Sequence, residues 1–251
     1  MRKAKNTKTT KRKSSVKRAR PNDPWGFSLD KLWEWDPDGA ALLTRVATNP
    51  WNSGILPPKE VELIPLALQS ACTNLDEAGT RRHIRAALKA GATREEILLV
   101  LKCGVGLAVH SCSLGAPILL EEMKAAGIVA ADAPKPETPA CDAMRAIGQW
   151  NSAWDPFYEL SPLWTDQFFA LGASIYKSGI FTPRFMELIS IAFDASVTHM
   201  YAPGTRRHIK GALKAGATPE EIMTVLQLCV SMGVQACAKG VPILAEEMKR
   251  R

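Results

Sequence analysis

The sequence lacks the patterns that mark several large classes of protein. Its six cysteines show no Cys-x-x-Cys spacing and follow no apolar signal segment, so we expect a reduced, cytoplasmic protein rather than a disulfide scaffold. No stretch alternates apolar and polar residues between turn signals, which leaves a β-sheet without support. No histidine and cysteine cluster has metal-ligand spacing, and no glycine-rich phosphate loop follows a strand. We therefore expect an all-α protein without a metal site.

Acidic residues are absent from the first 20 residues, which carry ten lysines or arginines. The rest of the chain has 22 basic and 25 acidic residues, so the formal charge of +7 comes from this end alone. A basic segment so poor in large apolar side chains cannot offset the entropy of ordering it. We expect residues 1–22 to be a disordered tail. A solvated extension without a partner is favoured over contact with nucleic acid or an anionic surface.

Two apolar stretches, residues 97–120 and 222–245, are long enough to suggest membrane spans. The first contains Lys102 and His110, Pro117 predicts a break in it, and the second stretch is more polar still. A membrane span would keep its character between two related copies. We therefore expect both stretches to be buried helices of a soluble protein, with no membrane partner.

The sequence does contain an internal repeat of one unit. Residues 79–97 recur almost unchanged at residues 204–222, and the offset of 125 holds without a gap from residues 54–124 to residues 179–249. Such self-similarity indicates a duplicated folding unit. The predicted organisation is a tail at residues 1–22, a first repeat at 23–128, a linker at 129–140 and a second repeat at 141–251.

Each copy predicts a helix, a glycine stop and a second helix. Apolar side chains at helical spacing follow Thr80, a candidate cap, and Gly91 ends that helix. Thr93 and Glu96 have the spacing of a capping box, and Pro219 falls at the first position of the corresponding helix in the second copy. The predicted fold class is all-α, with two tandem helical bundles. Further helices are predicted at residues 39–47, 59–72, 94–113, 118–124, 141–149 and 163–176, with an irregular arm at 21–36 and a loop at 48–58.

Polar residues shared by the two copies are the candidates for chemistry, because the copies differ at many other positions. Glu62 and Glu187 lie in otherwise apolar helices, and His83 and His208 each follow two arginines. Burial raises a carboxyl pKa towards neutrality, imidazole titrates there, and arginine binds carboxylates with paired hydrogen bonds. These residues are therefore candidate acid/base and anion-binding groups. The alternative is structural, with the same residues forming salt bridges at an interface.

The stretch at residues 83–97, with Glu62 one helix upstream, resembles the carboxymuconolactone decarboxylase and alkylhydroperoxidase-like superfamily. The pattern His-x3-Ala-Leu-x2-Gly-x-Thr-x-Glu-Glu-Ile carries the resemblance, which covers residues 54–124 and 179–249. The resemblance implies an all-helical fold and a site between packed helices that uses the glutamate and the histidine. It also implies assembly into trimers or hexamers, and we expect a trimer of two-repeat chains.

The alkylhydroperoxidase branch places a Cys-x-x-Cys pair seven and four residues before the histidine. Asp76 and Gly79 stand there in the first copy, and Tyr201 and Gly204 stand there in the second. Without that dithiol, peroxide cannot be reduced through an internal disulfide of this kind. The chain is therefore more similar to the decarboxylase branch.

That resemblance implies proton transfer at the carbon beside a lactone carbonyl, while arginine holds a carboxylate and no cofactor takes part. The second copy, which adds Asp194, His199 and Tyr201, is our choice for the active one. The predicted function is a lyase that decarboxylates a small carboxylate or lactone. The predicted catalytic residues are Glu62, His83, Glu187, His208 and His199, and the predicted substrate-binding residues are Arg81, Arg82, Arg206 and Arg207.

Two alternatives stay open from the sequence. A thiol-dependent peroxidase of peroxiredoxin type would use Cys112 or Cys237, the only cysteines that the copies share, although cysteine among small residues is usually a packing residue. A non-catalytic oligomeric binding protein would use the shared glutamate, arginine and histidine as subunit salt bridges, and its basic tail would recruit a partner.

Overall fold

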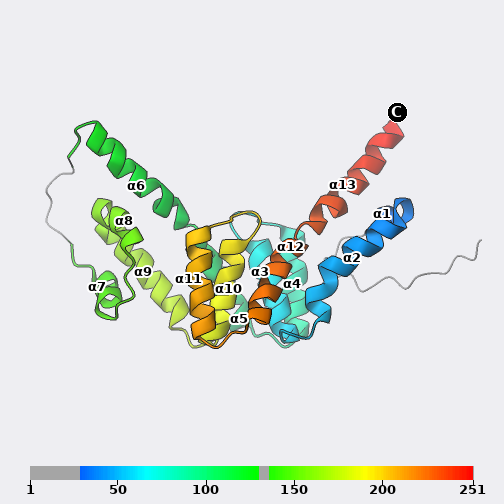
Figure 1. Cartoon of the computed structure of the whole chain (residues 1–251), viewed down its shortest axis with the longest axis horizontal. Helices are drawn as coiled ribbons and strands as arrows, with labels where there is room; N and C mark the ends of the chain where they lie inside the picture. The colour runs from blue at the N-terminus through cyan, green and yellow to red at the C-terminus, as the bar shows by residue number, and fades with distance from the viewer. Residues whose placement is uncertain (1–28, 130–135, 251) are drawn as a thin grey trace, which may run out of the picture.

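The computed structural model describes residues 29–129 and 136–250, and within these ranges it contains helices and no strand (Figure 1). The all-α prediction is confirmed. The predicted tail at residues 1–22, and residues 130–135 of the predicted linker, lie outside the described residues.

The duplication seen in the sequence is also present in the structure, because five helices of one copy correspond to five helices of the other. After α1 (Asp30–Trp35), the first copy comprises α2 (Pro37–Asn52), α3 (Pro58–Ser70), α4 (Glu77–Lys89), α5 (Arg94–Leu107) and α6 (His110–Ala125). After α7 (Pro139–Ala146), η1 (Ser152–Trp154) and α8 (Asp155–Leu160), the second comprises α9 (Pro162–Tyr176), α10 (Pro183–Ala195), α11 (Ala202–Lys214), α12 (Pro219–Ser231) and α13 (Val234–Glu247), with η2 (Met248–Arg250) at the end.

The local signals for helix ends are mostly confirmed. Thr93 and Glu96 form a reciprocal capping box at the start of α5, and the equivalent residues do so at α12. Gly91 has a φ of 89°, a left-handed conformation that costs other residues energy, so it ends α4 as expected. Thr80 is not the cap, however. Helix α4 begins earlier because the Asp76 carboxylate accepts a hydrogen bond from the Gly79 backbone N–H.

Proline was the least reliable signal. Pro50 lies inside α2, which runs through the first part of the predicted loop at residues 48–58, and Pro117 lies inside α6. The chain bends instead between Leu107 and His110, where glycines in the last turns of α5 weaken the helix. Residues 30–35 of the predicted irregular arm form α1.

A single apolar core serves both copies. Helices α3 and α10 pack against each other at its centre, and they bring in fully buried residues such as Leu63 and Leu188. Each copy's opening helix crosses over, because α2 packs on α12 and α9 packs on α5. Thr73 Oγ1 and Thr198 Oγ1, which occupy the same position in the two copies, are 3.0 Å apart. Equivalent atoms meet in this way only near an axis that relates the copies, so the repeats form one pseudo-symmetric body.

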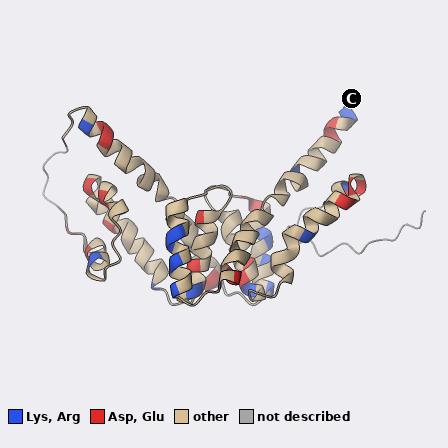
Figure 2. Ribbon diagram, in the orientation of Figure 1, with Lys and Arg blue, Asp and Glu red and all other residues tan. Residues whose placement is uncertain are grey.

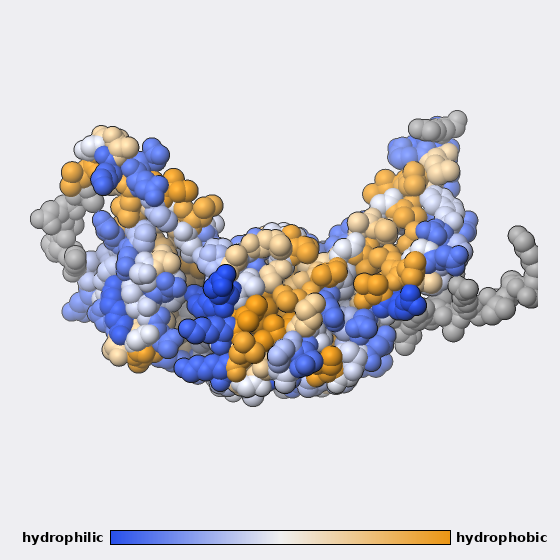
Figure 3. All heavy atoms as spheres, in the orientation of Figure 1, coloured by the Kyte–Doolittle hydropathy of each residue, from blue (hydrophilic) through white to orange (hydrophobic). Residues whose placement is uncertain are grey.

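Helices α6 and α13 stand away from this body as two arms (Figure 1). They carry few charged residues away from their tips (Figure 2), and apolar surface follows both arms (Figure 3). Ile118 and Leu119 on α6 are about half exposed, as are Ile243 and Leu244 at the equivalent positions of α13. The prediction that residues 97–120 and 222–245 are buried throughout is therefore wrong for the arms of the single chain.

By length and composition alone, residues 94–125 and 219–250 are each apolar enough to cross a membrane. Neither is one straight span, because the chain bends between α5 and α6 and between α12 and α13. Two such helices are weak grounds for a membrane assignment, since core and interface helices of soluble proteins have the same composition.

Arg184 joins the two copies electrostatically. Its Nη1 lies 3.2 Å from both carboxylate oxygens of Glu60 in the first copy, and its Nε lies 3.1 Å from Glu221 Oε2 in the second. Burial raises the pKa of Glu60, whereas the hydrogen bonds from Arg184 lower the pKa of Glu221. Lys59, the counterpart of Arg184, contacts Glu96 of its own copy at 2.7 Å.

We predict that Arg184→Met lowers the free energy of unfolding at pH 7 by about 1–3 kcal/mol, because two partly buried carboxylates lose a charged hydrogen-bond donor. Urea denaturation measures this. The matched control is Lys59→Met, where one more exposed ion pair is lost and the expected change is below about 1 kcal/mol. Equal losses in the two variants would contradict a linking role for Arg184.

Candidate active site

In each copy, a glutamate from one helix meets a histidine from the next. His83 Nδ1 on α4 lies 2.8 Å from Glu62 Oε2 on α3. His208 Nδ1 on α11 lies 2.6 Å from Glu187 Oε2 on α10. The structure therefore brings together the acid and the imidazole that the sequence singled out in each copy. Their catalytic role stays a prediction.

The hydrogen bonds around His208 assign its tautomer. Arg207 Nη2 lies 2.9 Å from His208 Nε2, and a guanidinium group only donates. The Nε2 atom therefore carries a lone pair, so the hydrogen sits on Nδ1 and is donated to Glu187. The Arg207 guanidinium also lies 5.8 Å from the centre of the Trp154 ring, which helps to hold it in place. The second copy thus presents a neutral imidazole with an unprotonated Nε2 beside a fixed cation.

The first pair is more closed than the second. Trp51 donates from Nε1 to Glu62 Oε1 at 2.9 Å, and its ring is stacked with the His83 ring. The His83 side chain is 1% exposed, compared with 9% for His208. At the position of Trp51 the second copy has Tyr176, whose hydroxyl bonds to Ser190 Oγ at 2.9 Å instead. Solvent and ligands therefore reach the second pair more readily.

The absence of a side chain at Gly211 leaves the space that the Glu187 carboxylate occupies. A Cβ atom on Gly211 would lie 2.7–2.8 Å from the carboxyl atoms of Glu187, which is closer than such atoms approach in folded proteins. The first copy has Ala86 at this position, and its glutamate is held by Trp51. The methyl group that Ala86 has and Gly211 lacks therefore contributes to the different positions of the two glutamate carboxylates.

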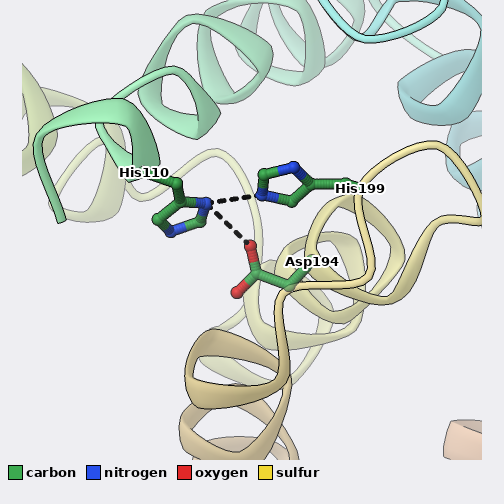
Figure 4. Close-up of side chains that lie close together, drawn as sticks. All are labelled: His110, Asp194 and His199. Atoms are coloured by element: carbon green, nitrogen blue, oxygen red, sulfur yellow. Dashed lines mark hydrogen bonds and ion pairs between the residues drawn. The ribbon is translucent and has the colours of Figure 1, made fainter. Parts of the chain in front are cut away.

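A second polar cluster lies beside the pair of the second copy (Figure 4). His110 Nδ1 is 2.7 Å from His199 Nε2 and 3.7 Å from Asp194 Oδ1, and the Tyr201 ring stacks on His110. Asp194 Oδ2 lies 3.6 Å from His208 Nε2. His199, predicted to be catalytic, therefore belongs to this cluster rather than to the glutamate–histidine pair.

Burial dominates the pKa values of this cluster. It raises the pKa of Asp194 to about 6, and the neighbouring His208 and Arg207 side chains partly offset that rise. It lowers the pKa of His110 to about 4, and nearby His199 adds to the effect. From the sequence, His110 counted only against a membrane span. The available signal is that His110 aligns with Gln235 of the second copy, an exchange of an amide for an imidazole.

A model of the carboxymuconolactone decarboxylase family matches residues 37–105 and 162–246, more than half of the chain and part of both copies. The chain belongs to this family. It is also similar to a solved structure from Burkholderia xenovorans LB400, described as a "putative gamma-carboxymuconolactone decarboxylase subunit", with 32% sequence identity and a TM-score of 0.79. That similarity covers 88% of this chain and 90% of the other. A search of curated proteins gives no match.

In this carboxymuconolactone decarboxylase family member, the four arginines predicted to bind substrate have different surroundings. Arg207 contacts His208, and Arg82 is partly buried at the equivalent position. Arg81 is exposed and pairs with Glu77 at 2.6 Å, one turn away on α4. Arg206 lines an open, mainly apolar hollow of about 560 Å³ on the other side of α11, which neither His208 nor Glu187 lines. The hollow's residues are Ala195, Met200, Ala202, Thr205, Arg206, Ile209 and Leu226.

The two shared cysteines lie in apolar clusters at the arms. Cys112 packs with Cys141 and Phe157, and Cys237 packs with Val234 and Ala238. Neither cluster contains a residue of a glutamate–histidine pair. All six cysteines are free thiols.

We predict that Gly211→Ala displaces the Glu187 carboxylate and breaks its hydrogen bond with His208 Nδ1. Alanine favours the helix by about 1 kcal/mol, which offsets most of the loss of that hydrogen bond, so the free energy of unfolding should change by less than about 1 kcal/mol. Imidazole ¹H–¹⁵N NMR measures loss of the bonded Nδ1 proton signal. Ala86→Gly, the mirror change in the first copy, should leave the His208 signal in place. A Gly211→Ala variant with an unchanged signal would refute the assigned role of this glycine.

Proposed function

We propose that the chain is a carboxymuconolactone decarboxylase-like enzyme that moves a proton during decarboxylation of a small carboxylate or lactone. The single observation that carries the proposal is the Arg207–His208–Glu187 arrangement. It combines an imidazole Nε2 that is ready to take a proton, a carboxylate that orients the imidazole, and a cation next to the reacting nitrogen.

The proposed step begins when a substrate carboxylate pairs with Arg207 and draws the guanidinium away from His208 Nε2. The Nε2 atom takes a proton from solvent, and Glu187 stabilises the resulting imidazolium. The carbon–carboxylate bond then breaks and releases CO₂, and its electron pair is delocalised into the conjugated lactone carbonyl. His208 delivers the proton to the carbon beside that carbonyl, which returns the imidazole to its neutral form.

The second copy is the proposed site of this reaction. Its pair is the more exposed one, and its cation contacts the reacting nitrogen directly. In the first copy, Trp51 occupies one oxygen of Glu62, and the histidine is almost fully buried. We therefore assign the first pair mainly to support of the fold.

The test is CO₂ release from γ-carboxymuconolactone, the compound named in the description of the similar structure. His208→Gln should lower kcat by about 10²–10⁴-fold, because a general acid/base contributes that much. His83→Gln, the matched change in the first copy, should lower kcat by less than about tenfold. The proposal fails if the wild type releases no CO₂, or if His208→Gln keeps full turnover. Blocking thiols with iodoacetamide should leave turnover in place, whereas a thiol peroxidase would lose its activity.

We also propose that the chain forms a trimer through the arms. The exposed apolar residues of α6 and α13 support this, since soluble monomers rarely expose contiguous apolar surface of this kind. Arm residues from a neighbouring chain would also cover the outer faces of the helices that carry the site.

The mass measured by light scattering after gel filtration should correspond to three chains of 27.4 kDa. Leu119→Glu combined with Leu244→Glu should shift it towards one chain, because charges would be buried at the interface. Glu122→Lys, a charge change at an exposed position of α6, should not. A wild-type monomer would refute the proposed assembly.

A further inference from the structure

The cluster of His110, Asp194 and His199 is not used by the proposed reaction. His110 begins α6 of the first copy, Asp194 lies near the end of α10, and His199 lies in the loop before α11. Two ring nitrogens and one carboxylate oxygen from these residues all lie within 4.8 Å of one another (Figure 4). The side chains come from both copies and turn these atoms towards a common point.

The cluster is not satisfied by its own hydrogen bonds. Asp194 is 3% exposed, and its Oδ2 has no hydrogen-bond partner among the described residues. Its Oδ1 comes within 3.7 Å of His110 Nδ1, which is beyond hydrogen-bond length. Between His110 Nδ1 and His199 Nε2 there is room for only one hydrogen. That hydrogen joins the two imidazoles and leaves none for the carboxylate beside them, so a buried carboxylate lacks donors, which is unusual inside a protein.

The equivalent cluster on the other side of the pseudo-symmetry axis shows what purely structural residues do at the same positions. Gln69 stands where Asp194 does, Asn74 where His199 does, and Gln235 where His110 does. Asn74 Nδ2 and Gln235 Nε2 both donate to Gln69 Oε1, at 2.9 and 2.8 Å. Side-chain amides that satisfy one another's hydrogen bonds are therefore sufficient to fill these positions in the fold. In the cluster of His110, Asp194 and His199, each of these amides is replaced by a residue type that ligates metals.

We propose that His110, Asp194 and His199 bind one divalent transition-metal ion, with Zn²⁺ as the ion that best fits two imidazoles and one carboxylate. This is a common donor set for zinc sites that keep an open coordination position. Zinc–nitrogen bonds of about 2.0–2.1 Å at tetrahedral angles place ligand atoms about 3.3 Å apart. The two imidazole nitrogens need to separate slightly from 2.7 Å, and the carboxylate oxygen needs to approach them from separations of 3.7 Å to His110 and up to 4.8 Å overall.

The surroundings agree with this assignment. A neutral imidazole offers one ring-nitrogen lone pair, which is what a metal requires. Both imidazoles are partly exposed, which leaves an approach for water or a ligand carboxylate at a remaining coordination position. The Asp194 oxygen that faces His208 fixes the site beside the glutamate–histidine pair without using either of its members. The inference does not rest on the decarboxylase proposal, and it departs from the expectation of a metal-free chain.

The test is Zn²⁺ binding to the full chain after chelator dialysis, with all thiols blocked by iodoacetamide, measured by calorimetric titration. The variant His110→Gln/Asp194→Gln/His199→Asn converts the cluster into the amide set that the fold already accommodates at the pseudo-symmetric position, so it should fold. We expect the wild type to bind one equivalent of Zn²⁺, and the variant to lose that equivalent or to bind it more than about tenfold more weakly. Equal binding by the two proteins would overturn the proposal.

The reverse change provides an independent readout. Gln69→Asp/Asn74→His/Gln235→His builds the same cluster at the pseudo-symmetric position, and it should add a second equivalent of Zn²⁺. Zinc should also raise the Tm of the wild type and of this variant, but not that of the amide variant, because a ligand that binds only the folded state stabilises it. A wild-type Tm that does not change with Zn²⁺ would count against the site, whatever the outcome of the decarboxylation assay.

Discussion

The packing of α3 against α10 is the constraint on which the rest of the structure depends. Every residue from Val61 to Gln69 on α3 is buried except Glu62, and α10 follows the same pattern around Glu187. Burying these helices against each other gives the molecule its core, and it also places each carboxylate under the next helix of its own copy. A carboxylate in that position needs a partner, and the histidine of α4 or α11 supplies it. The packing that forms the core therefore also positions the glutamate and histidine of each pair.

The parts of the fold that were predictable from sequence are those with local causes. The duplication, the capping boxes and the glycine stops follow from residues within a few positions of one another, and the structure contains them. The glutamate and histidine of each pair were found because they recur in both copies. A loop was predicted around Pro50 and a helix break at Pro117, but both residues lie inside helices. A helix that is held by packing on neighbouring elements tolerates the hydrogen bond that a proline removes.

The missed parts depend on contacts between the copies. His110 reaches Asp194 and His199 only because the bend after α5 brings the start of α6 over the other copy. Nothing near His110 in the sequence indicates that contact. Likewise, the choice between Arg206 and Arg207 depends on which face of α11 is turned towards Glu187. Comparison of the copies position by position would have flagged the exchange of histidine for glutamine, but not what it contacts.

The crossing of α2 onto α12 and of α9 onto α5 means that neither copy can complete its core alone. A chain with one copy would reach the same core only as a symmetric homodimer, and every mutation in it would alter two sites at once. Covalent fusion removes that restriction. One half is then free to keep a closed, tryptophan-capped pair and an inert amide network as scaffolding, while the other half exchanges the same positions for groups that titrate and coordinate.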